Sequence, residues 1–169
     1  MRNAILCALI LLAGFALAQH NNGKAFHLAV GGLPDRGSLP RLFTCDGKNV
    51  SPPLSWSGEP EGTQSLALIV DDPDARGFNH WLVWDIPASA HSLEQDAQKE
   101  GILGTNDFGH RGYGGPCPPE GAHVYSFRLF ALDVPSLNLK EGKRRDALDQ
   151  AMRKHVLAKA ELRLQYGRQ

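Results

Sequence analysis

The stretch SLALIVDDPDAR, Ser65–Arg76, joins a short apolar run to a cluster of carboxylates around a proline. Ser65–Val70 has the length and composition of a buried β-strand. Asp71–Arg76 follows at its end, where Asp and Pro form tight turns for structural reasons alone, but where functional side chains also gather. His80 opens the next apolar run along the chain. We therefore predict a strand followed by a turn that forms one wall of a polar pocket.

Two further runs predict strands of the same sheet. His80–Ile86 is rich in tryptophan and branched residues, and His123–Leu132 alternates so that Tyr125, Phe127 and Leu129 share one face. A shorter strand is expected at Arg41–Phe43. Frequent Gly and Pro residues between the runs indicate turns, so the fold class is all-β or α+β with few helices.

The C-terminal third changes character and predicts a helix. From Arg145 to about Leu157, apolar residues recur at helical spacing: Ala147, Leu148, Ala151, Met152 and Val156. This is the pattern of an amphipathic helix. Its basic residues would suit a membrane surface, but Asp146 and Asp149 interleave with them, which favours a solvated outer face. We expect this helix to pack on the sheet.

The first 18 residues have the pattern of a secretory leader. Arg2 supplies a positive charge, Ala4–Leu17 is apolar or small, and the triplet ALA at 16–18 matches a signal-peptidase site. The alternative is a membrane anchor, but the run is shorter than the roughly 20 apolar residues that a spanning helix needs. We expect cleavage after Ala18, a periplasmic or secreted product, and no transmembrane anchor.

The mature chain, Gln19–Gln169, has the length of one domain and can bury a sizeable core. Without Arg2 it carries 17 basic and 18 acidic side chains, a net charge of −1. That balance gives no electrostatic reason to bind nucleic acid or an anionic membrane surface. The sequence leaves the oligomeric state open, a homodimer included.

Two cysteines remain after cleavage, Cys45 and Cys117. An even pair in an exported chain is able to form a disulfide. The alternative is two separate buried thiols, because a free cysteine packs like a small apolar residue. Since the sequence does not give the Cα separation that decides between them, both interpretations stay open.

A long Gly/Pro-rich stretch, 101–119, lies between the second and third predicted strands. It exceeds the usual length of a connector, which is typical of functional or mobile loops. Closely spaced glycines let backbone N–H groups point at an anion, and His110 adds a titratable side chain within the loop. His123 and Tyr125 follow and point to the same face of their strand.

In this order, the motifs resemble the phosphatidylethanolamine-binding protein family, in particular its bacterial, Raf-kinase-inhibitor-like branch. The matching stretches cover almost the whole mature chain: FTCDG (43–47), SPPLSW (51–56), DDPDA (71–75), HWLVWDIP (80–87), NDFGHRGYGGPCPP (106–119) and HVYSFRLFALD (123–133). The resemblance implies a mostly β fold. A large antiparallel Greek-key sheet would pack with a smaller sheet, and the few peripheral helices would include a C-terminal one.

The resemblance also implies a small cavity for phosphate, a similar anion or a phospho-head group. The side chains implied to line it are Asp72, His80, His123 and Tyr125, with the backbone from Gly115 to Cys117 facing the anion. An imidazole can be charged or neutral near neutral pH, and a neighbouring Asp72 would favour the charged form. Because Asp72 is an acceptor, the set fits a zwitterion or a protonated phosphate better than a fully charged anion.

Two positions depart from the family pattern. Arg76 stands where the family has a proline, so that it either adds a cation at the pocket mouth or loosens the turn. Val124 stands where the family has an arginine that faces away from the pocket. Asp74 is expected to serve the turn, and with Arg76 and His110 it forms an accessory set.

Residues and resemblance together predict an exported protein that binds a small anion or phospho-head group, without turnover, cofactor or metal. A regulatory or inhibitory role towards a protein target is expected. Two alternatives remain. The chain could inhibit a periplasmic peptidase through a surface loop independent of the pocket. Alternatively, Asp72, Asp74, His80 and His123 are ligand types able to hold a metal for phosphoester hydrolysis, although the close spacing of known metal motifs is absent from the sequence.

Overall fold

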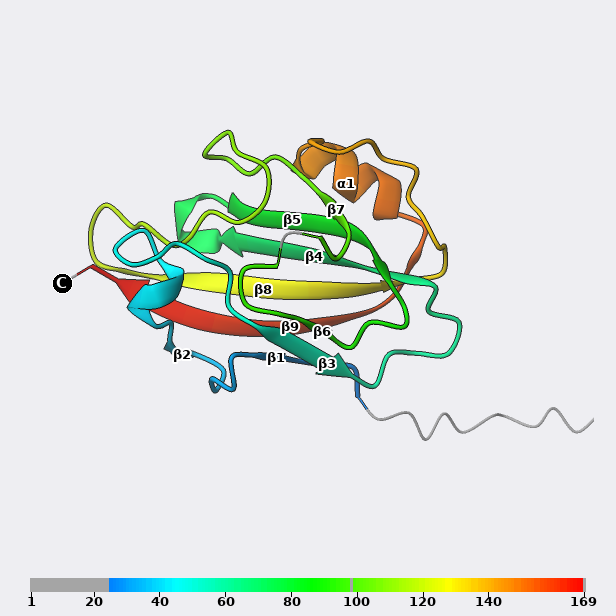
Figure 1. Ribbon diagram of the computed structural model, residues 1–169, viewed down its shortest axis with the longest axis horizontal. Coiled ribbons are helices and arrows are strands. Elements are labelled where there is room, and N and C mark those ends of the chain that lie inside the picture. The colour runs from blue at the N-terminus through cyan, green and yellow to red at the C-terminus, as the bar shows by residue number, and fades with distance from the viewer. Residues whose placement is uncertain (1–24, 98, 169) are drawn as a thin grey trace, which may run out of the picture.

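The computed structural model describes residues 25–97 and 99–168, so the expected leader, 1–18, lies outside the described residues. The described chain forms two sheets and a short α-helix (Figure 1). The large sheet has the strand order β2-β9-β8-β4-β5-β7, and the small sheet has the order β1-β3-β6. The strands of the large sheet are β2 (Gly37–Ser38), β4 (Ser65–Asp72), β5 (Phe78–Pro87), β7 (Ile102–Leu103), β8 (Ala122–Leu132) and β9 (Val156–Gly167). Those of the small sheet are β1 (His27–Val30), β3 (Leu54–Ser57) and β6 (Ser92–Leu93).

The connections between strands confirm the Greek-key topology implied by the resemblance. Neighbouring strands are antiparallel except at one edge, where β2 runs parallel to β9. After β7, the chain returns to place β8 beside β4, which gives the spatial order β8-β4-β5-β7. A fourth strand that lies next to the first of three is the defining feature of a Greek key.

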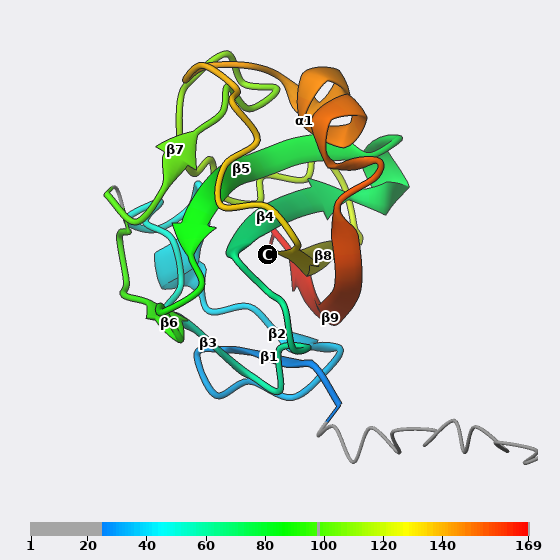
Figure 2. The same ribbon diagram turned by 90° about the vertical axis from the view of Figure 1, so that its right-hand side faces the viewer.

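The large sheet is covered on both faces. Figure 2 shows α1 (Arg145–Met152) against one face and the small sheet on the other side. One apolar core, which includes Leu28, Trp56 and Val70, fills the space between the sheets. A second core lies under the helix and includes Ile69 and Leu148. Every residue of β4 is therefore buried, which explains why Leu66–Val70 is a continuous apolar run instead of an alternating one.

The alternation predicted for His123–Leu132 is confirmed in β8. Tyr125, Phe127 and Leu129 are fully buried in the core between the sheets, whereas Phe130 packs on the core under the helix. His123 therefore lies on the same face as Tyr125, at the end of the sheet where β4 finishes.

Two local predictions are wrong. The helix ends at Met152, not near Leu157, and Val156 begins β9, whose buried residues Ala160, Leu162 and Leu164 alternate with exposed polar ones. Because apolar residues keep helical spacing up to Val156, the sequence pattern did not show where the helical repeat ends and the alternation of a strand begins.

The second wrong prediction concerns Arg41–Phe43, which forms a short 3-10 helix, η1, and not a strand. The amides of Phe43 and Thr44 donate to the carbonyls of Pro40 and Arg41, so the backbone groups of this segment are used within a turn.

No helix in the described ranges is long and apolar enough to cross a membrane.

Candidate functional site

The turn after β4 begins with a buried carboxylate. Asp72 is 3% exposed and precedes a short 3-10 helix, η2 (Pro73–Ala75). Its Oδ1 accepts a hydrogen bond of 3.1 Å from the Ala75 amide, so the side chain caps that helix. Capping of this kind is a common role for Asp. The prediction that the DPD segment forms a turn is therefore confirmed.

The other oxygen of the same carboxylate contacts His123. Nδ1 of His123 lies 2.7 Å from Oδ2 of Asp72, and the imidazole is 19% exposed whereas the carboxylate is 4% exposed. With Nδ1 donating to Asp72, the Nε2 atom of His123 is left for another partner. Asp72 thus orients the ring of His123 while it holds the turn.

His80 is buried beside these two residues. Its Nδ1 lies 2.7 Å from the carbonyl oxygen of Gly114, which fixes Nδ1–H as the donor. Burial lowers the pKa of His80, and it outweighs the opposing effects of the Gly114 carbonyl and of Asp72. Asp72 does favour the charged imidazole, as expected, but desolvation is the larger effect and the net pKa of His80 is lowered.

Tyr125 completes the cluster with a hydroxyl that has no hydrogen-bond partner among the described residues. Its side chain is fully buried. The His80 ring stands nearly perpendicular to the Tyr125 ring at 5.2 Å, and the His123 ring lies roughly parallel to it at 6.4 Å. Burial, and next the negative charge of Asp72, raise the pKa of Tyr125, so the phenol keeps its proton.

Two phenylalanines that sequence reasoning missed form the apolar surroundings of His80. The Phe78 and Phe108 ring centroids lie 5.3 and 5.4 Å from that of His80, and 4.8 Å from each other. Phe108 is 43% exposed, so it covers His80 at the surface. The aromatic neighbours account for the desolvation of His80. The sequence could have indicated Phe78 as a neighbour of His80, because residues two positions apart on a strand share a face.

The Gly-rich loop packs against the FTCDG turn, 43–47. Cys45 and Cys117 form a disulfide with a Cα separation of 5.4 Å, which decides between the two interpretations left open by the sequence. The Tyr113 hydroxyl donates to the Phe43 carbonyl at 2.6 Å. The loop that closes over His80 is therefore tied to this turn.

The amide of Gly115 does not face an open site. It donates to Oδ1 of Asn49 at 2.7 Å, so this donor, predicted to meet an anion, is already used within the protein. A Cβ atom at Gly115 would lie 2.5 Å from both Asn49 Oδ1 and the Phe43 carbonyl oxygen. The glycine is thus required for close packing of the loop against the turn. Asn49 had no signal in the sequence.

The accessory residues have different positions. Asp74 accepts a hydrogen bond of 2.8 Å from the Val124 amide, which ties η2 to the start of β8. Arg76 has a φ of 58°, a left-handed conformation that a proline, fixed near −65°, does not adopt. The turn at Arg76 therefore differs from one with proline at that position. His110 is exposed, and its backbone amide and carbonyl bond to Asn106.

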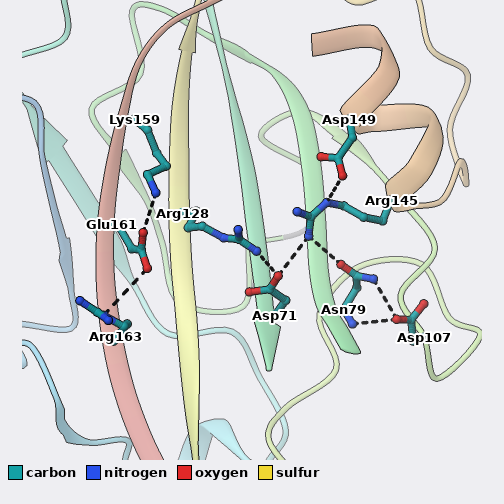
Figure 3. A network of polar contacts seen from close by, with 9 residues as sticks. All are labelled: Asp71, Asn79, Asp107, Arg128, Arg145, Asp149, Lys159, Glu161 and Arg163. Carbon is teal, nitrogen blue, oxygen red and sulfur yellow. Dashed lines mark hydrogen bonds and ion pairs between the residues drawn. The ribbon is translucent and has the colours of Figure 1, made fainter. Parts of the chain in front are cut away.

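A second carboxylate, Asp71, lies on the opposite face of β4 (Figure 3). Arg128 and Arg145 both donate to its Oδ2. Arg145 also donates to Oδ1 of Asn79 at 3.0 Å, and Asn79 donates from its backbone and side chain to Asp107 at 2.8 Å. Burial and the nearby Arg145 lower the pKa of Arg128. The network joins α1 to the sheet and to the loop that carries Phe108.

Outside this network, the polar cluster consists of Asp72, His80, His123 and Tyr125 at one end of the large sheet. No group of three or more His, Cys, Asp or Glu side chains in the described part of the chain is arranged to hold a metal ion. The cluster offers a phenol O–H donor, two imidazoles oriented through Nδ1, and one carboxylate. Such a set can bind a small ligand that carries both acceptors and a donor or positive charge.

Comparison with known proteins identifies relatives with the same arrangement of elements. The profile of the phosphatidylethanolamine-binding protein family matches residues 32–167. The UPF0098 protein of Methanothermobacter thermautotrophicus is 48% identical over 136 residues, 76% of this chain and 89% of that protein. The UPF0098 protein of Aquifex aeolicus is 47% identical over 133 residues, 73% of this chain and 78% of that protein.

Solved structures agree with these sequence matches. A phosphatidylethanolamine-binding protein homologue from Chlamydia trachomatis has a TM-score of 0.81 and 36% identity, and the match covers 86% of this chain and 99% of that one. YbcL of Escherichia coli, described as a member of the mammalian family, has a TM-score of 0.80 and 32% identity, with 86% and 100% coverage. The chain belongs to the phosphatidylethanolamine-binding protein family.

Proposed function

We propose that the cluster around Tyr125 binds a small phosphate-bearing ligand, of the kind found in a phospho-head group, and releases it unchanged. The proposal rests on the buried Tyr125 hydroxyl, which has no hydrogen-bond partner in the part of the chain that the structure describes. A buried donor that makes no hydrogen bond costs about 1–3 kcal/mol. An acceptor oxygen from a ligand removes that cost, so the site favours a ligand with an oxygen at this position.

The charges of the cluster select the protonation state of the ligand. Asp72 is buried, and the lowered pKa of His80 favours its neutral form. A doubly charged phosphate would meet the Asp72 carboxylate with little compensating positive charge. A singly charged phosphate, or one that carries an ammonium group, places a proton or a cation near Asp72 instead. Phosphorylethanolamine carries a phosphate and an ammonium group, and it represents the phosphate-bearing ligands that we propose for this site.

Binding without turnover is favoured by the way in which the polar groups are used. Asp72 already accepts from Ala75 and contacts His123, and His80 donates to Gly114. These contacts hold the side chains in fixed orientations, which suits the binding of a ligand. The family name likewise refers to binding and not to a reaction.

The ligand test compares probes by isothermal titration calorimetry at constant ionic strength: phosphorylethanolamine, inorganic phosphate and ethanolamine. We expect phosphorylethanolamine to bind most tightly. Tyr125→Phe removes the unpartnered hydroxyl, and we expect it to weaken that binding about tenfold. Because the hydroxyl makes no hydrogen bond of regular geometry with any described residue, the unfolding temperature of this variant should change little. Equal binding by Tyr125→Phe and the unmodified protein would refute the proposed site.

His123→Gln and His155→Gln provide a matched pair of variants. Each histidine contacts an aspartate through Nδ1, His123 with Asp72 at 2.7 Å and His155 with Asp133 at 2.8 Å. His155 lies after α1, away from the cluster. We expect His123→Gln alone to weaken binding of phosphorylethanolamine. A similar loss in both variants would mean that the effect is not local to the cluster.

The leader pattern in residues 1–18 supports export as part of the same proposal. We propose that the mature protein begins at Gln19 and acts outside the cytoplasm. N-terminal sequencing of the protein recovered from its native compartment tests this. A product that still begins at Met1 in the cytoplasmic fraction would contradict it.

A further inference from the structure

A cleft of about 440 Å³ lies at the same end of the molecule as the Tyr125 cluster, over the edge formed by β2 and the end of β9. Figure 1 shows the end of β9 at this end of the sheet, beside the point where β8 begins. The residues of interest that line the cleft are Ser38, Arg41, Asp46, Ala122, Tyr166 and Arg168. The proposed ligand site uses none of them.

The lining carries an excess of positive charge. Asp46 accepts hydrogen bonds from the Tyr166 hydroxyl at 2.7 Å and from Arg168 at 3.1 Å. The Tyr166 hydroxyl, and to a smaller extent Arg168, lower the pKa of Asp46, so it is ionised at neutral pH. Among the described residues of the lining, one carboxylate therefore faces two guanidinium groups, which leaves one net positive charge.

Part of each guanidinium group is available to a ligand. Arg41 uses its Nε to donate to the Asp46 carbonyl at 2.6 Å, and Arg168 uses one terminal nitrogen. The two terminal nitrogens of Arg41 and the remaining donors of Arg168 have no hydrogen-bond partner in the described part of the chain. Guanidinium groups with free donors match the oxygens of phosphate and carboxylate.

The cleft adjoins the first site through neighbouring strands. Tyr166 on β9 is the partner of His123 on β8, and side chains at directly opposite positions in an antiparallel pair point to the same face. Ala122, which lines the cleft, immediately precedes His123. Tyr166 also contributes to the raised pKa of Tyr125. A ligand in the cluster can therefore extend past His123 into the cleft.

The FTCDG turn, 43–47, forms a wall common to both sites. Asp46 lines the cleft, and the preceding residue, Cys45, is bonded to Cys117 of the loop that covers His80. The Cys45 amide also donates to the Pro116 carbonyl at 3.1 Å. These bonds fix the position of the cleft relative to the first site.

We propose that the cleft is a second anion subsite, which binds the second acidic group of a ligand whose first phosphate occupies the Tyr125 cluster. The ligand class is a small organic molecule with two phosphate groups joined by a short linker. This inference rests on the proposed function, because the first phosphate uses the proposed site. Arg41 and Arg168 are the residues that distinguish this ligand from one with a single phosphate.

The experiment compares two matched probes, propane-1,3-diol monophosphate and bisphosphate, by calorimetry at constant ionic strength. We expect the unmodified protein to bind the bisphosphate about tenfold more tightly than the monophosphate. The double variant Arg41→Gln with Arg168→Gln should lose this preference and still bind the monophosphate as before. Both arginines are exposed, so we expect little change in the unfolding temperature.

The control is Arg153→Gln, which removes one positive charge at the exposed end of α1, away from the cleft. It should keep the preference for the bisphosphate. The inference is overturned if the unmodified protein binds both probes equally, or if Arg153→Gln loses the preference as much as the double variant does. If neither probe binds the unmodified protein but phosphorylethanolamine does, only the inference fails. If phosphorylethanolamine does not bind either, the proposed function fails as well. If only the preference is missing, the proposed function stands and the second subsite does not.

Discussion

Asp71 and Asp72 are adjacent in the sequence but serve different faces of the sheet. Asp72 faces the core between the sheets, where it contacts His123 and caps η2. Asp71 faces α1, where it accepts from Arg128 and Arg145. The difference follows from the alternation of side chains along a strand. At the level of single residues, one carboxylate thus belongs to the proposed ligand site and its neighbour to the network that joins α1 to the sheet.

The buried His80 leads to a pH-dependent stability. Because its pKa in the folded protein is below the ordinary value of 6.5, the folded state binds fewer protons than the unfolded state between these two pKa values. The free energy of unfolding therefore has its full value above pH 6.5 and decreases as the pH falls through the pKa of folded His80. We expect urea unfolding to show this decrease between about pH 7 and 5.

His80→Gln isolates the contribution of this histidine. The variant lacks the titrating group, so its unfolding free energy should decrease less over the same pH range. All other ionisable groups are common to both proteins and cancel in the comparison. Parallel pH profiles for the two proteins would mean that His80 is not the group responsible.

Among the elements, the FTCDG turn and the Gly-rich loop depend on each other. Each segment uses a backbone carbonyl of the other, as in the bonds from the Tyr113 hydroxyl to Phe43 and from the Cys45 amide to Pro116. The disulfide between Cys45 and Cys117 closes a sequence separation of 72 residues. This cross-link therefore restricts the unfolded chain and also holds the loop over His80.

Removal of the disulfide tests both effects. For Cys45→Ala with Cys117→Ala, we expect the unfolding free energy to fall by up to about 4 kcal/mol, the value for a loop of this length in the chain-entropy model. We also expect weaker binding of phosphorylethanolamine, because the loop that covers His80 becomes less constrained. Chemical unfolding and calorimetry measure the two effects. The reduced form of the unmodified protein is the control and should behave like the variant. If the unfolding free energy and the ligand affinity of the variant are unchanged, the noncovalent bonds alone hold the loop in place.

In the whole molecule, the Asp71 network connects parts that are far apart in the sequence. It links α1, through Arg145, to β4, β8 and β5, and then to the loop at Asp107 (Figure 3). Removal of one partner from a buried ion pair leaves the other charge uncompensated. Asp71→Asn removes the carboxylate between two guanidinium groups. We expect it to lower the unfolding free energy by about 3 kcal/mol in urea unfolding.

Glu161→Gln is the matched control for that prediction. Glu161 also lies between two cations, Lys159 and Arg163, but on the exposed part of β9. We expect this variant to lose less than about 1 kcal/mol, because exposed ion pairs are screened by water. An equal loss in both variants would argue against a special role for the buried network.

The sequence by itself determined the strands at Ser65–Val70, His80–Ile86 and His123–Leu132, because continuous and alternating apolar patterns are local properties of the chain. It also predicted the turn at Asp72, and by resemblance to a family it named the residues that gather beside Tyr125. Only the tertiary structure decided that Val156 starts a strand, that Cys45 pairs with Cys117, and that Asn49 uses the Gly115 amide. The reason is physical: each of these outcomes depends on contacts between distant segments, and burial by such contacts also decides which form of His80 is favoured.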